Sequence, residues 1–152
     1  MKTLADPARR AEIARRLKTI TADSRRRWGR MSAPQMVCHL CDAYRMAAGR
    51  KTVRAVTGAF PRTLVKWLAL YLPVRWPAGI PTLREIDPLC EGTKPGDFAR
   101  DVAELETLLE FLATRENDFE WPLHPLFGRM SRAEWHRWAY LHADHHLRQF
   151  GA

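Results

Sequence analysis

Three histidines at helical spacing are the residues of this 152-residue chain most suited to chemistry. His142 and His146 stand four residues apart, so on an α-helix both imidazoles leave the same face, one turn apart. His39 lies in a separate helical stretch, residues 33–48. Three imidazoles that converge from two helices are a common way to hold a divalent transition metal with coordination positions left open. We therefore expect a metal site.

The two histidine helices have well-marked starts. The tetrapeptide Gly-Arg-Met-Ser occurs twice, directly before each of them. Ser32 with Gln35, and Ser131 with Glu134, both have the spacing of a capping box, in which serine and the acid or amide satisfy reciprocal backbone donors. His39 lies seven residues after its cap serine, Ser32, and His142 and His146 lie 11 and 15 residues after theirs, Ser131, so the three offsets differ by four. All three should therefore point from a similar face of their helices.

The other elements must bring those two helices together. Asp6 before Pro7 predicts the start of a first helix, Phe60 to Leu72 predicts a short apolar one, and residues 98–115 form a clean amphipathic one. Residues 73–97 are rich in proline and glycine and are interpreted as a long ordered loop laid across the helices. No stretch alternates with period two. We expect one all-α domain, residues 1–152, with four principal helices, a short extra helix and a proline-rich crossover.

The histidine face continues the apolar stripe begun by Trp135, so His142 and His146 should point inward. Buried imidazoles need partners, which a metal or ordinary hydrogen bonds would supply. The addition of His39 on an equally inward face favours the metal. His145 lies at the edge of the stripe and is assigned a supporting or packing role. Two further histidines are interpreted as a loop and a surface position: His124 and His136.

The charge of the chain is +8 and is uneven, because residues 1–30 hold ten basic and three acidic groups. Such a run could contact nucleic acid, but a solvated outer helix face is favoured, since the basic residues are not interleaved with aromatic ones and no recognised nucleic-acid-binding motif accompanies them. The longest apolar stretch, residues 64–76, is interrupted by Lys66, Pro73 and Arg75 and is too short to cross a bilayer. We expect a cytoplasmic protein that has no membrane contact.

The cysteines do not indicate a disulfide framework. Cys38 and Cys41 form a C-x-x-C pattern inside the helical stretch of residues 33–48, and no second cysteine pair at zinc-knuckle spacing accompanies it. At about 100° per residue, Cys38 should lie about 100° around the helix from His39, and Cys41 near the side opposite His39. Core packing is favoured over a redox or zinc role for both.

Several segments resemble the DinB-like superfamily, in particular one of its uncharacterised branches. They are residues 27–39 (RWGRMSAPQMVCH) and 124–131 (HPLFGRMS), followed by Trp135, His142, His145 with His146, and Gln149-Phe150-Gly151. The resemblance implies an up-down-down-up four-helix bundle with a divalent metal, often nickel or zinc, held by three histidines. Their positions match His39, His142 and His146, and Gln149 matches a glutamine that follows the last ligand. Iron and manganese remain alternatives for the metal.

The resemblance also implies a reaction class, since characterised relatives include thiol-dependent transferases and isomerases and proteins described as metal-dependent hydrolases. The first hypothesis is an enzyme in which the metal activates water or a low-molecular-weight thiol to attack a small electrophile. Asp42, one turn beyond His39, is the candidate for moving a proton or orienting a ligand. Arg148, where relatives often have glycine, is the candidate for placing an anionic substrate.

Two other hypotheses stay open beside the enzyme. One is a metal-binding or structural bundle without turnover, for which a homodimer is an open alternative. The other, which is disfavoured, is a nucleic-acid-binding module that uses the arginine-rich first helix. For the favoured hypothesis the expected partner is a small-molecule substrate.

Overall fold

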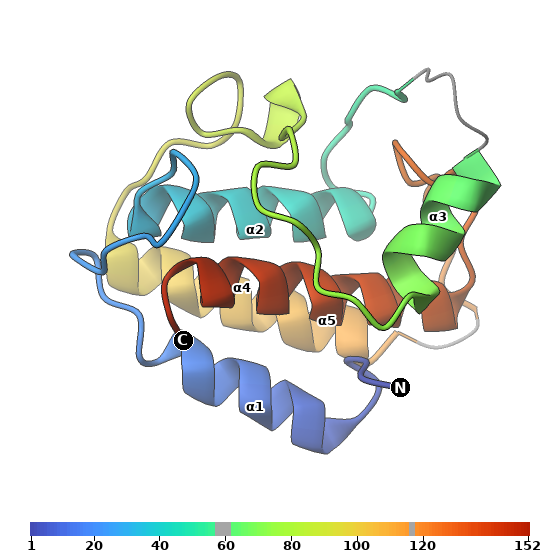
Figure 1. Cartoon of the computed structure of the whole chain (residues 1–152), viewed down its shortest axis with the longest axis horizontal. Helices are drawn as coiled ribbons and strands as arrows, with labels where there is room; N and C mark the ends of the chain where they lie inside the picture. The colour runs from blue at the N-terminus through green and yellow to red at the C-terminus, as the bar shows by residue number, and fades with distance from the viewer. Residues whose placement is uncertain (57–61, 116–117) are drawn as a thin grey trace.

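The computed structural model describes residues 1–56, 62–115 and 118–152, in which helices are joined by turns and loops (Figure 1). The elements are α1 (Pro7–Leu17), α2 (Ala33–Ala47), α3 (Arg62–Tyr71), the short 3-10 helix η1 (Arg84–Ile86), α4 (Phe98–Ala113) and α5 (Arg132–Gln149). No strand occurs in the described ranges, where the single β-type contact is an isolated bridge between His124 and Gly128. The expected all-α class is confirmed.

The helices begin where side chains can satisfy the first backbone donors. The Asp6 carboxylate accepts from the amide of Ala8 at the start of α1, and the Asp97 carboxylate accepts from that of Arg100 in α4. Both predicted capping boxes are present, at Ser32 for α2 and at Ser131 for α5. These caps fix the first turn of each helix and so fix which way the later side chains point.

Four of the helices lie roughly along the long axis of the molecule. Figure 1 shows α1, α2, α4 and α5 in this arrangement, with α3 across one end. α2 packs against α4 and α5, α1 packs against α5, and α3 also contacts α5. The core between them is built from large buried side chains that include Tyr44, Leu105, Leu112, Trp135 and Tyr140. This packing holds α2 beside α5, which is the pair of helices that carries the three histidines.

The segment between α3 and α4 is an ordered crossover, as expected. It runs from the end of α3 past α5 and α2 to the start of α4, with η1 near its middle (Figure 1). The Trp76 indole donates to the Ala69 carbonyl at 2.7 Å, which ties the first part of the crossover to α3. The predicted start of the third helix, Phe60-Pro61, lies outside the described residues. The helix ends at Tyr71, one residue before the predicted end.

The basic groups of residues 1–30 mostly lie on the surface, as the solvated-face interpretation requires. Arg16 is the exception: it is buried and donates to the Asp144 carboxylate at 2.7 Å, which joins α1 to α5. Among the described residues no helix has both the length and the apolar character needed to cross a membrane.

Candidate metal centre

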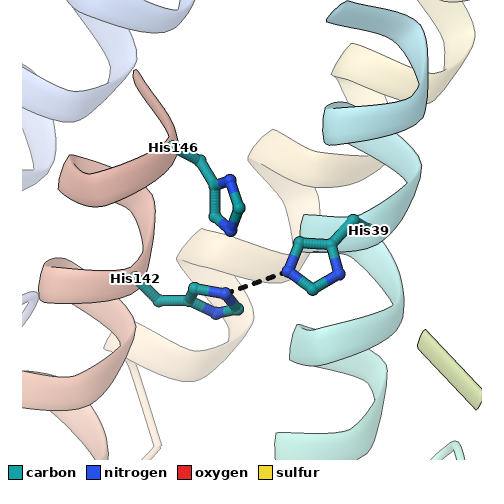
Figure 2. A group of neighbouring side chains, drawn as sticks. All are labelled: His39, His142 and His146. Carbon is teal, nitrogen blue, oxygen red and sulfur yellow. Dashed lines mark hydrogen bonds between the residues drawn. The ribbon is translucent and has the colours of Figure 1, made fainter. Parts of the chain in front are cut away.

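The three predicted histidines converge between α2 and α5. His39 comes from α2, and His142 and His146 come from successive turns of α5 (Figure 2). The Nε2 atoms of His39 and His142 are 3.1 Å apart, and the ring centroid of His146 lies 4.7 Å from that of His39 and 5.0 Å from that of His142. One ring nitrogen of each residue lies within 4.8 Å of the other two. The prediction that these imidazoles share a common point is confirmed.

The outer nitrogens of two of these rings are held by carbonyl oxygens. His39 Nδ1 lies 2.7 Å from the Ile86 carbonyl oxygen, and His146 Nδ1 lies 2.9 Å from Gln149 Oε1. A carbonyl oxygen can only accept, so each Nδ1 carries the proton and donates it. The proton-free nitrogen of each neutral ring is therefore Nε2, whose lone pair is available. Histidines that bind metals are usually held in this way by a partner on the other nitrogen.

Gln149 is itself fixed, which makes the tautomer of His146 unambiguous. Its amide nitrogen donates to the Trp28 carbonyl at 2.9 Å, so Oε1 must be the atom that faces His146. This contact depends on Gly29, whose backbone has φ +79°. A Cβ at that position would lie 2.4 Å from the Gln149 amide nitrogen. The glycine thus lets the Trp28–Gly29 turn approach the end of α5.

His142 shows most directly that these side chains do not satisfy one another. Its Nδ1 is buried and has no hydrogen-bond partner among the described residues, while its Nε2 faces His39 Nε2. One shared proton could relieve the contact between those two nitrogens, but it would leave His142 Nδ1 as an unpaired acceptor. Three nitrogens bound at about 2.0–2.1 Å to a tetrahedral ion would lie about 3.3 Å apart. The observed spacings, from 3.1 Å to at most 4.8 Å, fit such an ion after small side-chain rotations.

The local electrostatics keep these rings neutral. Burial lowers the pKa of His39, against the opposing effect of its hydrogen bond to the Ile86 carbonyl. Burial also lowers the pKa of His142 and of His146 well below the ordinary range, and the neighbouring histidines lower both further because like charges would repel. Since imidazole binds a metal only in its neutral form, the site is in the binding-competent state at neutral pH.

A pocket opens beside the three histidines. Its volume is about 100 Å³, and its walls include His39, His142 and His146 together with His124, Trp138 and residues of the crossover. Trp76 and the stretch from Ile80 to Leu83 form the crossover side of this pocket. The proline-rich segment therefore does more than connect α3 to α4, because it closes one side of the site.

The residues expected to support the site divide into two groups. Gln149 is in contact with His146, as described, and His145 packs edge-on against His146 at 5.0 Å between ring centroids. Asp42 and Arg148 do not join them. Both Asp42 oxygens accept hydrogen bonds from other side chains and backbone, and the Arg148 guanidinium donates to the Asp144 carboxylate at 2.9 Å. Neither residue lines the histidine pocket.

Two histidines are buried where the sequence interpretation placed them in a loop and on the surface. His124 is 4% exposed and lines the pocket, and His136 is 3% exposed with Nε2 3.0 Å from the Leu112 carbonyl oxygen. The surface interpretation of His136 is therefore wrong. His124 does lie in a connection, but that connection folds inward. Edge-on and tilted contacts with aromatic rings accompany the burial of both, since each packs against tryptophans of the 121–138 region.

The cysteine prediction holds. Cys38 and Cys41 are buried, and burial raises the pKa of each thiol to about 12. Such thiols stay protonated and are poor nucleophiles and metal ligands. The C-x-x-C pattern is thus part of the contact between α2 and α4, where both sulfurs face Asp101.

Comparisons with known proteins place the chain in a family. No curated protein and no solved structure matches it. One family model, described as "Protein of unknown function (DUF1569)", matches residues 13–152. The match includes all three histidines, Gln149 and both capping boxes. The protein, with its three-histidine cluster between α2 and α5, is a member of the DUF1569 family.

Proposed function

We propose that this protein is a metal-dependent enzyme whose site consists of His39, His142 and His146. One observation carries the proposal: three buried, neutral imidazoles bring one ring nitrogen each within 4.8 Å of one another, carbonyl oxygens hold Nδ1 of two of them, and Nδ1 of His142 has no partner among the described residues. Buried polar atoms are ordinarily matched donor to acceptor. A proton shared between His39 and His142 would leave His142 Nδ1 unmatched, whereas a cation could accept a lone pair from each of the three rings.

The ligand set indicates the kind of ion. Imidazole suits zinc, nickel, iron and copper rather than magnesium or calcium, which prefer oxygen. Three protein ligands leave coordination positions open, as in catalytic rather than structural zinc sites. An ion held there would act as a Lewis acid and would lower the pKa of a bound water or thiol.

The surrounding residues provide what such chemistry needs from the protein. The Ile86 carbonyl and Gln149 orient two imidazoles, and burial keeps all three uncharged. Trp76, Trp138 and the crossover limit the access of bulk water to a pocket of about 100 Å³. This volume suits a substrate of a few heavy atoms, or the reactive end of a larger one. We propose attack by water or a low-molecular-weight thiol on a small electrophile.

The resemblance that implies this reaction class also implies a helix topology. We infer that α1, α2, α4 and α5 form an up-down-down-up four-helix bundle of the DinB-like type. The lengthwise arrangement of these helices and the origin of the histidines, one from the second helix and two from the last, support this inference. Nickel and zinc are the ions expected from that resemblance.

Metal content and turnover test the proposal in sequence. Elemental analysis of protein purified without a histidine tag should find about one transition-metal ion per chain, and His142→Ala should lose it. His145→Ala is the matched control, because that neighbouring imidazole lies outside the group of three. Hydrolysis of p-nitrophenyl acetate, measured with and without N-acetylcysteine, should then require the metal. Equal metal content in wild type and His142→Ala would overturn the site, and metal binding without turnover would favour a non-catalytic metal protein.

A further inference from the structure

The loop that precedes α5 is folded tightly around the ring of His124. The backbone amide of His124 donates to the Gly128 carbonyl, and the amide of Gly128 donates to the His124 carbonyl, both at 2.8 Å. Gly128 closes the loop with φ +68°, a backbone conformation that favours glycine. Pro125, Leu126 and Phe127 form the turn between them. The loop is thus a closed five-residue unit with one imidazole at its first position.

The two nitrogens of His124 have different roles. Nδ1 accepts hydrogen bonds from the backbone amides of Leu126 and Phe127, each at 3.2 Å. A nitrogen that accepts two N–H groups cannot carry a proton, so in the neutral ring the proton is on Nε2. The ring stacks on Phe127 at 4.3 Å with an interplanar angle of 12° and packs edge-on against Trp138. These contacts prevent the ring from turning over.

The proton on Nε2 is left without an acceptor. In the described part of the chain the hydrogen bonds of this ring go to Nδ1 and none goes to Nε2, and the residue is 4% exposed. His124 is one of the walls of the histidine pocket, with His142 and Trp138 as its neighbours. Burial lowers the pKa of His124 to about 3, so the ring remains an uncharged donor at neutral pH. An oxygen acceptor that entered the pocket would give this donor a hydrogen bond that no described group of the protein supplies.

We propose that the Nε2–H of His124 binds an oxygen acceptor of the substrate, either a carbonyl or a carboxylate oxygen, inside the histidine pocket. This inference rests on the proposed function and narrows its substrate class to small acyl compounds. A neutral imidazole held in one tautomer can polarise a carbonyl oxygen without transferring a proton, because giving up the Nε2 proton would leave a strongly basic imidazolate. The pocket thereby gains a polar group that does not compete for the metal.

The tautomer can be tested on the metal-free wild-type protein, without any variant. Long-range ¹H–¹⁵N correlation spectra distinguish a protonated Nε2 from a protonated Nδ1 in each imidazole. His124 should be in the Nε2–H form throughout the range from pH 6 to pH 8. A His124 protonated on Nδ1, or one that becomes charged in this range, would overturn the inference.

Binding of two small probes, acetate and acetamide, tests the role of the donor. Each should shift the His124 Nε2–H resonance in zinc-loaded protein, and the stronger of the two distinguishes a carboxylate site from a neutral carbonyl site. His124→Asn retains an oxygen acceptor for the loop amides but loses the donor, and should weaken the stronger probe about tenfold, the value of one hydrogen bond of about 1.4 kcal/mol. His124→Gln restores a donor at about the position of Nε2 and should recover part of that affinity.

The outcomes separate this inference from the proposed function. If wild-type protein fails to take up zinc, the proposed function fails, whatever the His124 tautomer. If zinc binds equally to wild type and His124→Asn but the probes also bind equally, or bind to neither, the role of His124 is refuted and the metal site stands. Zinc-induced stabilisation that persists in His124→Asn serves as the folding control.

Discussion

Two buried polar clusters lie one turn apart on α2, and they differ in how completely they are satisfied. Around Asp42 every acceptor has a donor: Oδ1 accepts from Arg45 and Thr93, and Oδ2 accepts from Lys51 and the Thr93 amide, all at 2.8–2.9 Å. Around His39 the match is incomplete: the Nε2 atoms of His39 and His142 can share only one proton, and His142 Nδ1 has no partner among the described residues. A polar group whose partners are all internal stabilises the fold, whereas a set of converging unmatched acceptors indicates a ligand.

The same contrast explains why the nearest carboxylate is not the best candidate for proton transfer. Asp42 is fully buried, and although burial acts to raise the pKa of its carboxyl, the hydrogen bonds from Thr93, Lys51 and Arg45 hold that pKa below the ordinary value. A carboxylate in this state is a weak base and has no free lone pair toward the pocket. Its function is to join α2 to the segments that carry Lys51 and Thr93.

Of the changes considered, lowering the pH should destabilise the metal-free protein most, because the buried histidines are held neutral. His124, His142 and His146 are held neutral in the folded protein, with pKa values well below the ordinary value of about 6.5. Unfolding lets them bind protons, so the metal-free protein should keep its stability above about pH 6.5 and lose it as the pH falls. Each such histidine contributes about 1.4 kcal/mol per pH unit, or roughly 4 kcal/mol per unit for the three.

Urea unfolding of metal-free protein at several pH values between 5 and 7.5 measures this loss. His142→Phe, which removes one of the titrating rings, should reduce the slope by about a third. A free energy of unfolding that does not change between pH 7 and pH 5.5 would mean that these histidines are not held neutral.

Asp42→Ala should cause the next largest effect, and on stability alone. The substitution leaves the partly buried Lys51 without its carboxylate and removes one of the two carboxylates that Arg45 contacts, and it should destabilise the protein by about 3 kcal/mol. The rise in melting temperature on addition of zinc should be retained. Thermal unfolding with and without zinc checks both parts. Loss of the zinc response in this variant would show that Asp42 contributes to the metal site.

His142→Ala should instead change the response to zinc. An ion at a hundredfold excess over its Kd stabilises the folded state by about 2.7 kcal/mol, which for a domain of this size is several degrees of melting temperature. His142→Ala should abolish that rise with zinc or nickel, because two imidazoles bind far more weakly than three. His145→Ala should retain it, and a retained rise in His142→Ala would show that the metal binds elsewhere.

Gln149→Leu should have a smaller effect, on metal affinity rather than on the ligand set. Removing a group that orients a ligand usually costs 10–100-fold in affinity, roughly 1.4–2.7 kcal/mol. Gly29→Ala should act in the same direction, since its Cβ would displace the Gln149 amide from the Trp28 carbonyl. Competition of each variant with a chromophoric zinc chelator measures the loss. Gly49→Ala is the matched control. Gly49 also has a positive φ, but a Cβ at that position would meet no atom within 4 Å.

Local signals allowed much of this molecule to be predicted from its sequence. The caps at Ser32 and Ser131 and the four-residue spacing of the histidines depend on contacts within one helix, so the two helix starts and the three converging rings followed directly. The pairing of Arg148 with Asp144 has the same local origin, an i,i+4 spacing that was available in the sequence.

The features that the sequence did not reveal depend on contacts between distant segments. Asp42 lies on the face expected, but its partners include Lys51, from the segment just after α2, and Thr93, which the folded crossover brings to α2. His124 reaches the pocket because its loop closes on itself and its ring stacks among aromatic residues of α5. No periodicity in the sequence marks such a contact. Only the glycine at position 128 could have suggested a tight turn there.

The two anchored imidazoles also differ in how they can change during evolution. His146 is held by a side chain, so any replacement of Gln149 alters its anchor. His39 is held by the backbone carbonyl of residue 86, at the end of η1, and every amino acid would supply the same oxygen there. The bond to His39 therefore places no demand on the side chain of residue 86, which is constrained instead by its burial in the core beside the pocket. A scan of point mutations would overlook this anchor, and only a change in the length or conformation of the crossover would expose it.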